Sequence, residues 1–424
     1  MLFSEMDKTQ LNKLHEELKN EYENIKDLGL KLNMSRGVPS VEQLNLSQKM
    51  FDVLNSDSDC NSENGTECRN YGVLDGIPEC KKLMADMMGV EPSMVMVGGN
   101  SSLNMMFDTI ACFMTTPVCE GAKPWYEVKD RKFLCPVPGY DRHFGVTEYF
   151  GFQMIQIPMT DDGPDMDMVE ELIKDESVKG MWCVPKYSNP QGITYSDETV
   201  KRIANLKPAA KDFRIMWDNA YCIHDLTDTP DKLLNIFDEI KNTDNEDLVI
   251  GFCSTSKISL PGSGVAALFT FENNMKVLKN KYKFQTIGYD KLNMLRHVRF
   301  FKDIDGMKAH MQKHKEILQP RFEMVVSKLK ENLDGLGVIE YRVPNGGYFV
   351  SVNVMKNTAK RVVELCKEAG VTLTNAGATY PYGDDPNNSN IRIAPTFPSL
   401  EDLSKAMDVF CICTKLAATE ELLK

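Results

Sequence analysis

Residues 248–264 read LVIGFCSTSKISLPGSG, an apolar run followed by three hydroxyl residues, a lysine and a Pro-Gly turn. The run at 248–253 has no polar alternation, which is typical of a strand buried on both faces of a parallel sheet. Lys257 follows this strand. A lysine amine at the end of a buried strand loses solvation, so its pKa falls and it becomes a nucleophile. The alternative is a surface lysine in a turn.

Similar apolar runs recur along the first two thirds of the chain, and helical stretches separate most of them. This alternation predicts an α/β fold with a mostly parallel, seven-stranded sheet covered on both faces. Chemistry in such a fold belongs in the loops at the carboxyl ends of the strands. The further predicted strands are 94–97, 132–137, 152–159, 179–185, 214–218 and 265–271, and the helices include 101–115, 166–176, 196–206 and 230–241.

The C-terminal third has a different pattern, in which a long helix at 306–334 precedes VIEYRVPNGGYFVSVNV. That segment predicts two strands around a bend at Gly346 and Gly347, and helices at 357–369 and from Ser399 complete a smaller α+β domain. The N-terminal stretch 7–28 has helical periodicity with Asp7 as its N-cap. We therefore predict a large domain at 45–305 and a small domain made of 1–44 with 306–424.

Composition narrows the class of protein. The 424 residues carry 49 Lys+Arg against 61 Asp+Glu, a formal net charge of -12. This charge argues against a general affinity for nucleic acid or for an anionic membrane. No window approaches the roughly 18 apolar residues of a spanning helix, and the charged N-terminus does not resemble a signal peptide, so we expect a cytoplasmic protein.

A metal site is not expected. His310 and His314 lie four residues apart in HMQKH, but the glutamate of the HExxH zinc motif is absent and Lys313 and Lys315 flank the pair. The segment therefore predicts a solvated helix face.

Polar residues also follow three other predicted strands. Asp218 ends RIMWD and Tyr221 comes three positions later, Asn189 lies in VPKYSNPQG, and GGNSS at 98–102 joins a strand to a helix. A carboxylate at the end of a buried strand needs a cationic partner, and backbone amides at a helix N-terminus suit an anion. Each feature alone is also explained as a turn or a cap. Four at successive strand ends indicate a binding site.

The ordered motifs GGNSS, PGYDRH, SNPQG, DNAY, STSK and NIRIAPT resemble those of the fold-type I pyridoxal-phosphate enzymes, specifically the class I aminotransferases. Their wording, with SRGVPS near the N-terminus, is similar to the divergent Ic, or MocR-like, branch of aspartate aminotransferases. The resemblance runs from about residue 33 to the C-terminus.

The resemblance implies a role for each matching position. Lys257 would form the Schiff base with pyridoxal 5'-phosphate and then move the proton, and Asp218 would keep the pyridine nitrogen protonated. Asn189 and Tyr221 would hydrogen-bond the phenolic oxygen. Tyr140 would stack on the cofactor ring. Tyr71 matches the tyrosine that such homodimers extend to the phosphate bound by the partner. The residues implied to bind the phosphate within the chain are Gly99, Asn100, Ser101, Ser102, Ser254 and Ser256.

Substrate carboxylates require arginines. Arg392 in NIRIAPT matches the family arginine that binds the α-carboxylate in a bidentate pair. A dicarboxylic substrate needs a second cation, for which Arg142 in YDRH and then Arg36 in MSRG are the candidates. The alternative for these two is a structural ion pair with one of the acidic residues.

The chain departs from the family pattern after the lysine. Many relatives carry a phosphate-binding arginine in this loop, whereas here the loop is shorter and Gly264 falls near that place. Arg296 and Arg299 in MLRHVRFF are possible replacements.

The resemblance implies an aminotransferase that moves an amino group between aspartate or glutamate and a 2-oxo acid such as 2-oxoglutarate or oxaloacetate. The alternatives are an aromatic or kynurenine aminotransferase, a β-lyase, and the effector-sensing domain of a MocR-type regulator. About 30 residues precede the SRG motif, too few for the basic winged helix of such a regulator. We therefore expect small-molecule partners, a homodimer, and neither nucleic acid nor membrane.

Overall fold

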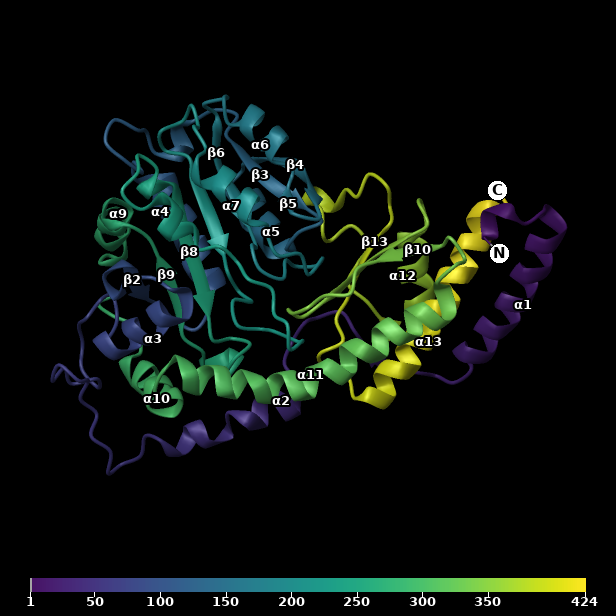
Figure 1. Ribbon diagram of the computed structural model, residues 1–424, viewed down its shortest axis with the longest axis horizontal. Coiled ribbons are helices and arrows are strands. Elements are labelled where there is room, and N and C mark those ends of the chain that lie inside the picture. Colours follow the sequence, from purple (N-terminus) through teal and green to yellow (C-terminus); the bar gives the residue numbers. More distant parts are fainter. Residues whose placement is uncertain (1) are drawn as a thin grey trace.

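The apolar run before Lys257 forms β8 (Val249–Ser254), a central strand of the main sheet in a computed structural model that describes residues 2–424. Within these residues the sheet has eight strands (Figure 1). Their order is β2 (Val95–Val97), β9 (Ala266–Phe269), β8, β7 (Arg214–Asp218), β6 (Val178–Cys183), β3 (Lys132–Val137), β4 (Gln153–Thr160) and β5 (Gly163–Pro164).

All seven predicted strands are present, and the sheet is mostly parallel as expected. The strands β4, β3, β6, β7 and β8 pair in parallel, whereas β9 is antiparallel to both of its neighbours. The predicted number of strands, seven, was one too few. The eighth strand, β5, has two residues that pair antiparallel to the end of β4, and so short a segment leaves no apolar run in the sequence.

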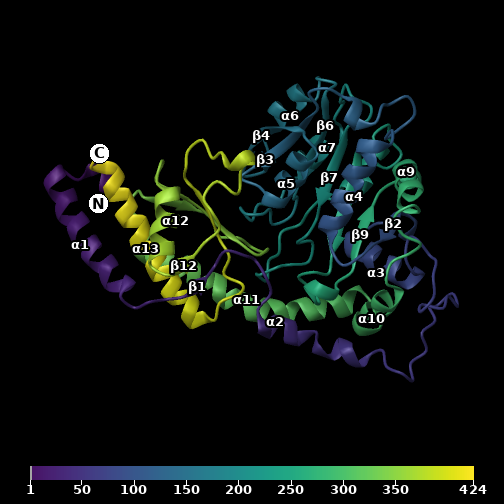
Figure 2. The same cartoon turned by 180° about the vertical axis from the view of Figure 1, so that it is seen from behind.

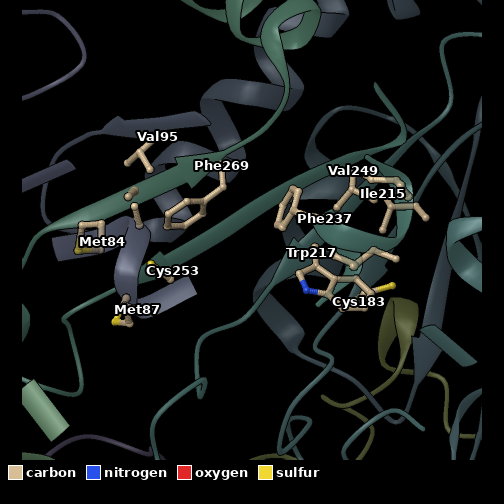
Figure 3. Packing of buried hydrophobic residues seen from close by; sticks show 14 of the residues in the cluster. Met84, Met87, Val95, Cys183, Ile215, Trp217, Phe237, Val249, Cys253 and Phe269 are labelled. Carbon is tan, nitrogen blue, oxygen red and sulfur yellow. The ribbon is translucent and has the colours of Figure 1, made fainter. Parts of the chain in front are cut away.

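Both faces of the sheet are buried, which explains the absence of polar alternation. In β7, Ile215 and Trp217 belong to the core on one face, and Met216 belongs to the core on the other. Figure 3 shows part of the first of these cores, where Phe237 lies beside Trp217, and Phe269 lies on the side of Met84 and Met87. The first face is covered by α3 (Pro78–Met88), α6 (Met166–Leu172), α7 (Asp197–Ala204), α8 (Ile236–Ile240) and α10 (Lys291–Phe301), and the second by α4 (Ser102–Thr115), α5 (Asp141–Tyr149) and α9 (Glu272–Tyr282).

One helix is much shorter than predicted. Of the stretch 230–241, only α8 is helical. Asn235 caps it by accepting from the amide of Phe237, and the same side chain donates to the carbonyl of Gly89, the C-cap of α3. Tertiary contacts therefore hold the preceding residues in an irregular path despite their helical periodicity.

A second lobe contains the N-terminal segment and the C-terminal third (Figure 2). Asp7 caps its first helix as predicted, because its carboxylate accepts from the amide of Gln10. The bend at Gly346 lies against the Tyr187 ring, where a Cβ would come within 2.2 Å of a ring carbon. The elements are α1 (Lys8–Lys26), α2 (Val41–Leu46), α12 (Ala359–Glu368), α13 (Leu400–Leu422), the antiparallel sheet β10 (Ile339–Tyr341), β11 (Val350–Val354) and β13 (Asn390–Ile393), and the parallel pair β1 (Leu32–Asn33) and β12 (Val371–Thr372).

The long helix α11 (Ile304–Leu333) runs along both lobes (Figure 1). Met307 and Met311 at its beginning belong to the core of the large lobe, and residues from Leu318 onward belong to the core of the small one. The predicted domain limits at residues 45 and 305 remain a prediction.

The prediction of a solvated face on α11 was wrong. His310 and His314 are buried, with 5% and 1% of their surface exposed, and their ring nitrogens contact the chain next to Lys257. The flanking lysines misled the prediction, since Lys315 is itself buried and pairs with Asp228.

The long helices are not membrane spans. Within residues 2–424, no helix combines the length and the apolar content needed to cross a bilayer.

Candidate active site

A cavity of about 180 Å³ opens where β7 and β8 end. It gathers residues from five separate stretches of the chain, as expected for a site at the carboxyl edge of a parallel sheet. The predicted residues that line it are Ser101, Ser102, Tyr140, Asn189, Asp218, Tyr221, Ser254, Ser256 and Lys257. Leu103, Met106, Val184 and Ala220 complete the lining.

Lys257 extends its amine between two aromatic rings. Its Nζ lies 4.9 Å from the centre of the Tyr221 ring and 5.7 Å from that of Tyr348. Burial lowers the pKa of Lys257, Asp218 opposes this shift, and the positive charge of Arg392 adds to it. A lysine so placed gives up its proton more readily than one in water, as a nucleophile or a general base must.

The lowered pKa of Lys257 leads to a prediction about stability. Because the folded protein holds this proton less tightly than the unfolded chain, the charged amine destabilises the fold at low pH, and the penalty disappears as the pH rises through the folded pKa toward 10.5. We expect Lys257→Met to raise the melting temperature at neutral pH, with a gain that shrinks under alkaline conditions. Calorimetry of both proteins without ligands, across pH, measures this; a gain that grows with pH would contradict it.

Asp218 is held by a histidine that the sequence analysis did not assign. The Nε2 atom of His143 donates to Asp218 Oδ2 over 2.9 Å, and its ring stacks on Trp182 with the centres 4.2 Å apart. The other oxygen, Asp218 Oδ1, is buried and has no hydrogen-bond partner among residues 2–424. A buried carboxylate oxygen without a partner is energetically costly and indicates a ligand that donates to it.

Two tyrosines surround this carboxylate. Tyr221 is buried, and burial raises its pKa well above the ordinary value. Tyr140 lies against His143 with ring centres 5.0 Å apart, and burial, with the nearby charges of Asp218 and Asp141, raises its pKa to about 12. Both phenols therefore stay protonated at neutral pH and act as hydrogen-bond donors.

The opposite end of the cavity suits an anion. Ser101 is the N-cap of α4, a helix of 14 residues, but its side chain makes no capping hydrogen bond. The first backbone amides of the helix therefore do not donate to the Ser101 side chain and can donate to a bound anion. Ser254 donates to Ser256 over 3.0 Å, and Ser256 donates to the carbonyl of Asn100 over 3.2 Å. Hydroxyls and a helix N-terminus together form the usual environment for a phosphate.

Gly99 contributes through its main chain, and Asn100 through both its main chain and its side chain. The carbonyl of Gly99 accepts from the amide of Ala266 in β9, and the side chain of Asn100 reaches the carbonyls of Pro261 and Gly262 over 3.4 Å. Both residues fix the loop before α4 rather than line the cavity.

The suggested replacement cations, Arg296 and Arg299, do not belong to the lining of the cavity. Arg296 donates to Asn293, whose amide donates to the carbonyls of Ser263 and Gly264, so Arg296 is linked through Asn293 to the loop that lacks the family arginine. Arg299 instead donates to the carbonyl of Asp59. Among the described residues 2–424, the cavity lining includes neither of these two guanidinium groups.

Arg392 lies on β13, where the small lobe faces the cavity. Its Nη1 donates to Asn189 Oδ1 over 3.2 Å and to Asp141 Oδ1 over 3.1 Å. The guanidinium lies 4.7 Å from the centre of the Phe349 ring. Its Nε is buried and has no acceptor among residues 2–424, so a donor remains for an incoming carboxylate.

Three predicted residues lie outside this assembly. Arg142 is exposed and lines a separate hollow with Phe107 and Tyr149. Arg36 is exposed too, but its neighbour Gly37 packs on the Phe349 ring, which also contacts the guanidinium of Arg392. Tyr71 is 82% exposed and does not line the cavity of its own chain.

Sequence reasoning missed His143, Asp141 and Phe349. His143 and Asp141 stood inside the quoted motif PGYDRH, and their position in the first turn of α5 after Tyr140 was the available signal. Phe349 follows the Gly346-Gly347 bend without any polar pattern, so nothing local marked it.

Comparison with known proteins agrees with this geometry. Residues 6–424 match the family model described as aspartate amino-transferase. The chain is 44% identical over 416 residues to an aspartate aminotransferase of Corynebacterium glutamicum, covering 98% of this chain and 96% of that protein. The chain therefore belongs to the aspartate amino-transferase family.

Solved structures give the same class. An aspartate transaminase crystal structure from Corynebacterium glutamicum is 43% identical, has a TM-score of 0.97, and covers 100% of this chain and 99% of that chain. The α-aminoadipate aminotransferase of Thermus thermophilus, solved with N-(5'-phosphopyridoxyl)-L-leucine, has a TM-score of 0.74 at 18% identity, over 92% and 93% of the two chains, and shows the shared fold. The protein is thus a pyridoxal-phosphate-dependent aminotransferase of fold type I.

Proposed function

We propose that this enzyme uses pyridoxal 5'-phosphate to transfer the amino group of aspartate or glutamate to a 2-oxo acid, by a two-step exchange on one site. One juxtaposition carries the proposal. The buried Lys257 amine, the unpartnered Asp218 Oδ1 and the serines at the start of α4 meet in one cavity. These three groups suit an aldehyde, a protonated ring nitrogen and a phosphate.

The residues present therefore fit the cofactor. Ser101, Ser102, Ser254 and Ser256 would hold its phosphate, and Asp218, itself fixed by His143, would hold its ring nitrogen. When bound, the cofactor supplies the electron sink that stabilises negative charge at the substrate α-carbon.

The chain's own groups perform the remaining tasks. Lys257, with its lowered pKa, takes the proton from the substrate α-carbon and then donates it again in the 1,3-proton shift that amino transfer requires. Arg392 binds the α-carboxylate, and Asn189, which accepts from Arg392, orients that arginine from the floor of the site. The Phe349 ring covers the guanidinium and shields its ion pair from water.

The proposed donors are acidic, so a second cation must bind the distal carboxylate within a protein of net charge -12. Arg36 adjoins the Phe349 wall, whereas Arg142 faces another hollow. A partner subunit would complete the site, and Tyr71 supports a homodimer because its exposed ring has no role in its own cavity.

The half-reaction tests the proposal. Aspartate added to cofactor-loaded protein without an acceptor should shift the cofactor absorbance to that of its amino form and release oxaloacetate in equal amount. A shift with phenylalanine or kynurenine but not with aspartate or glutamate would instead indicate the aromatic class, and release of pyruvate and ammonia from β-chloroalanine would indicate a β-lyase.

The arginine pair leads to a specificity prediction. A charge-assisted bond is worth about 1.5–3 kcal/mol, so Arg36→Leu should lower kcat/KM on aspartate by roughly 10- to 100-fold and on phenylalanine much less. Arg142→Leu is the matched control. A selective loss in Arg142→Leu alone would assign the distal carboxylate to that residue, and no selective loss in either variant would remove both from the scheme.

A further inference from the structure

The turn that carries Lys257 is held from behind by two histidines of α11. The Nε2 atoms of His310 and His314 each lie 3.0 Å from the carbonyl oxygen of Ile258. A carbonyl oxygen has two lone pairs and can accept from both rings. The residue next to the active lysine is therefore fixed to the helix that runs along both lobes.

The side chain of Gln43 determines how His314 can act. Gln43 is fully buried on α2, and its Oε1 accepts from the amide of Ser40 over 3.1 Å. That bond identifies the other end as the amide nitrogen, which has two hydrogens to donate. The amide nitrogen lies 3.1 Å from His314 Nδ1 and 2.9 Å from the Tyr348 hydroxyl oxygen, so one hydrogen faces each of them.

This arrangement selects one form of His314. An NH₂ group that donates to Nδ1 requires that nitrogen to carry no proton, so the ring proton lies on Nε2, aimed at the Ile258 carbonyl. Burial, with the neighbouring His310 as a smaller contribution, lowers the pKa of His314 to about 4. Burial also lowers the pKa of His310 to about 4, so both rings are neutral at physiological pH.

The second hydrogen of the amide leads to Lys257 by another route. The Tyr348 hydroxyl that accepts from Gln43 lies 3.5 Å from the carbonyl of Lys257, and its ring is one of the two that face the Lys257 amine. The same ring stacks on Tyr221 with the centres 6.1 Å apart. One amide therefore reaches two consecutive carbonyls, those of Lys257 and Ile258.

We infer that Gln43 is a positioning residue for Lys257. Its two donor hydrogens set the tautomer of His314 and the orientation of Tyr348, and these in turn fix the main chain on both sides of the lysine. The inference rests on the proposed function, in which Lys257 is the catalytic amine, and adds to it a residue on α2, more than two hundred positions away in the sequence.

Two substitutions at position 43 test this inference through the histidine itself. In Gln43→Leu, nothing donates to His314 Nδ1, so only the Ile258 carbonyl still favours the proton on Nε2 and the preference for that tautomer weakens. In Gln43→Glu, an ionised carboxylate faces Nδ1, so the proton moves to Nδ1 and the pKa of His314 rises. Long-range ¹H–¹⁵N spectra of histidine-labelled holoenzyme, assigned with His314→Gln, read both changes without any substrate.

Kinetics give the second readout. A displacement of well under 1 Å at the lysine should lower kcat of Gln43→Leu by about 10-fold or more while the KM for aspartate changes by less than about twofold. Asn274→Leu is the matched control, since Asn274 is also fully buried and uses both ends of its amide, but on Arg214 and Asp247. We expect it to reduce stability and to leave the His314 spectrum and the kcat unchanged.

Three results would overturn the inference: an unchanged His314 spectrum in both Gln43 variants, an altered spectrum with unchanged kcat, or an equal loss of kcat in Asn274→Leu. The proposed function has a separate test, because it fails if wild-type holoenzyme gives no half-reaction with aspartate or glutamate, whatever the spectra of the variants show.

Discussion

Lys257→Ala should lower turnover on aspartate by about 10⁴-fold, the upper range for losing a positioned acid–base group. The remaining cavity groups cannot replace it. Tyr221 and Tyr140 hold their protons because burial raises both pKa values, and Asp218 is engaged by His143. The cavity of Lys257→Ala therefore lacks a group that can accept a proton from the substrate α-carbon.

Stopped-flow absorbance of the half-reaction measures this effect. Lys179→Met is the matched control, because Lys179 is also buried but pairs with Asp212 at the opposite end of β6. The control should fold less stably and keep its rate. A Lys257→Ala protein that still converted aspartate would show that another residue moves the proton.

Asp218→Asn should lower the same rate by about 10²- to 10³-fold, as for removal of a preorganised charge that faces the reacting group. The amide keeps the shape of the carboxylate and its oxygen can still accept from His143. It carries no negative charge, however, and presents neutral NH₂ or carbonyl groups where Oδ1 is now unpartnered. Positive charge next to that position therefore loses its stabilising partner.

The controls for Asp218→Asn separate binding from rate. Cofactor affinity should fall far less than turnover, because the serines at α4 still hold the phosphate. His143→Gln leaves the carboxylate charge intact while removing its orienting donor, so its effect should be intermediate. An Asp218→Asn enzyme as fast as the wild type would contradict the proposed role of the carboxylate.

The strands of the large lobe were predictable because burial on both faces demands unbroken apolar runs, and β7 and β8 have them. The polar residues at the carboxyl ends of these strands, Asp218 in β7 and Lys257 shortly after β8, were predictable for the same reason, since strand ends of a parallel sheet meet at one edge. The two-residue β5 was not predictable, because it pairs only through the hairpin geometry at the end of β4.

Residues that act through others could not be predicted from local sequence. His143 becomes significant only through the stacking of Trp182 and the carboxylate of Asp218 from two other strands. His310 and His314 carry lysine neighbours that suggest exposure, whereas the turn at Ile258 and other groups far away in the sequence bury them. Gln43 had no signal, because all of its partners are distant except Ser40.

The path of α11 has a consequence for how the protein can be divided. One continuous helix provides apolar side chains to two cores. Cutting the chain within α11 would therefore leave each fragment with part of the helix and with apolar side chains exposed to solvent. The two lobes are thus unsuited to separate expression or exchange as modules. Insertions are better tolerated in the exposed polar loop at 55–67, where the chain contributes little to either core.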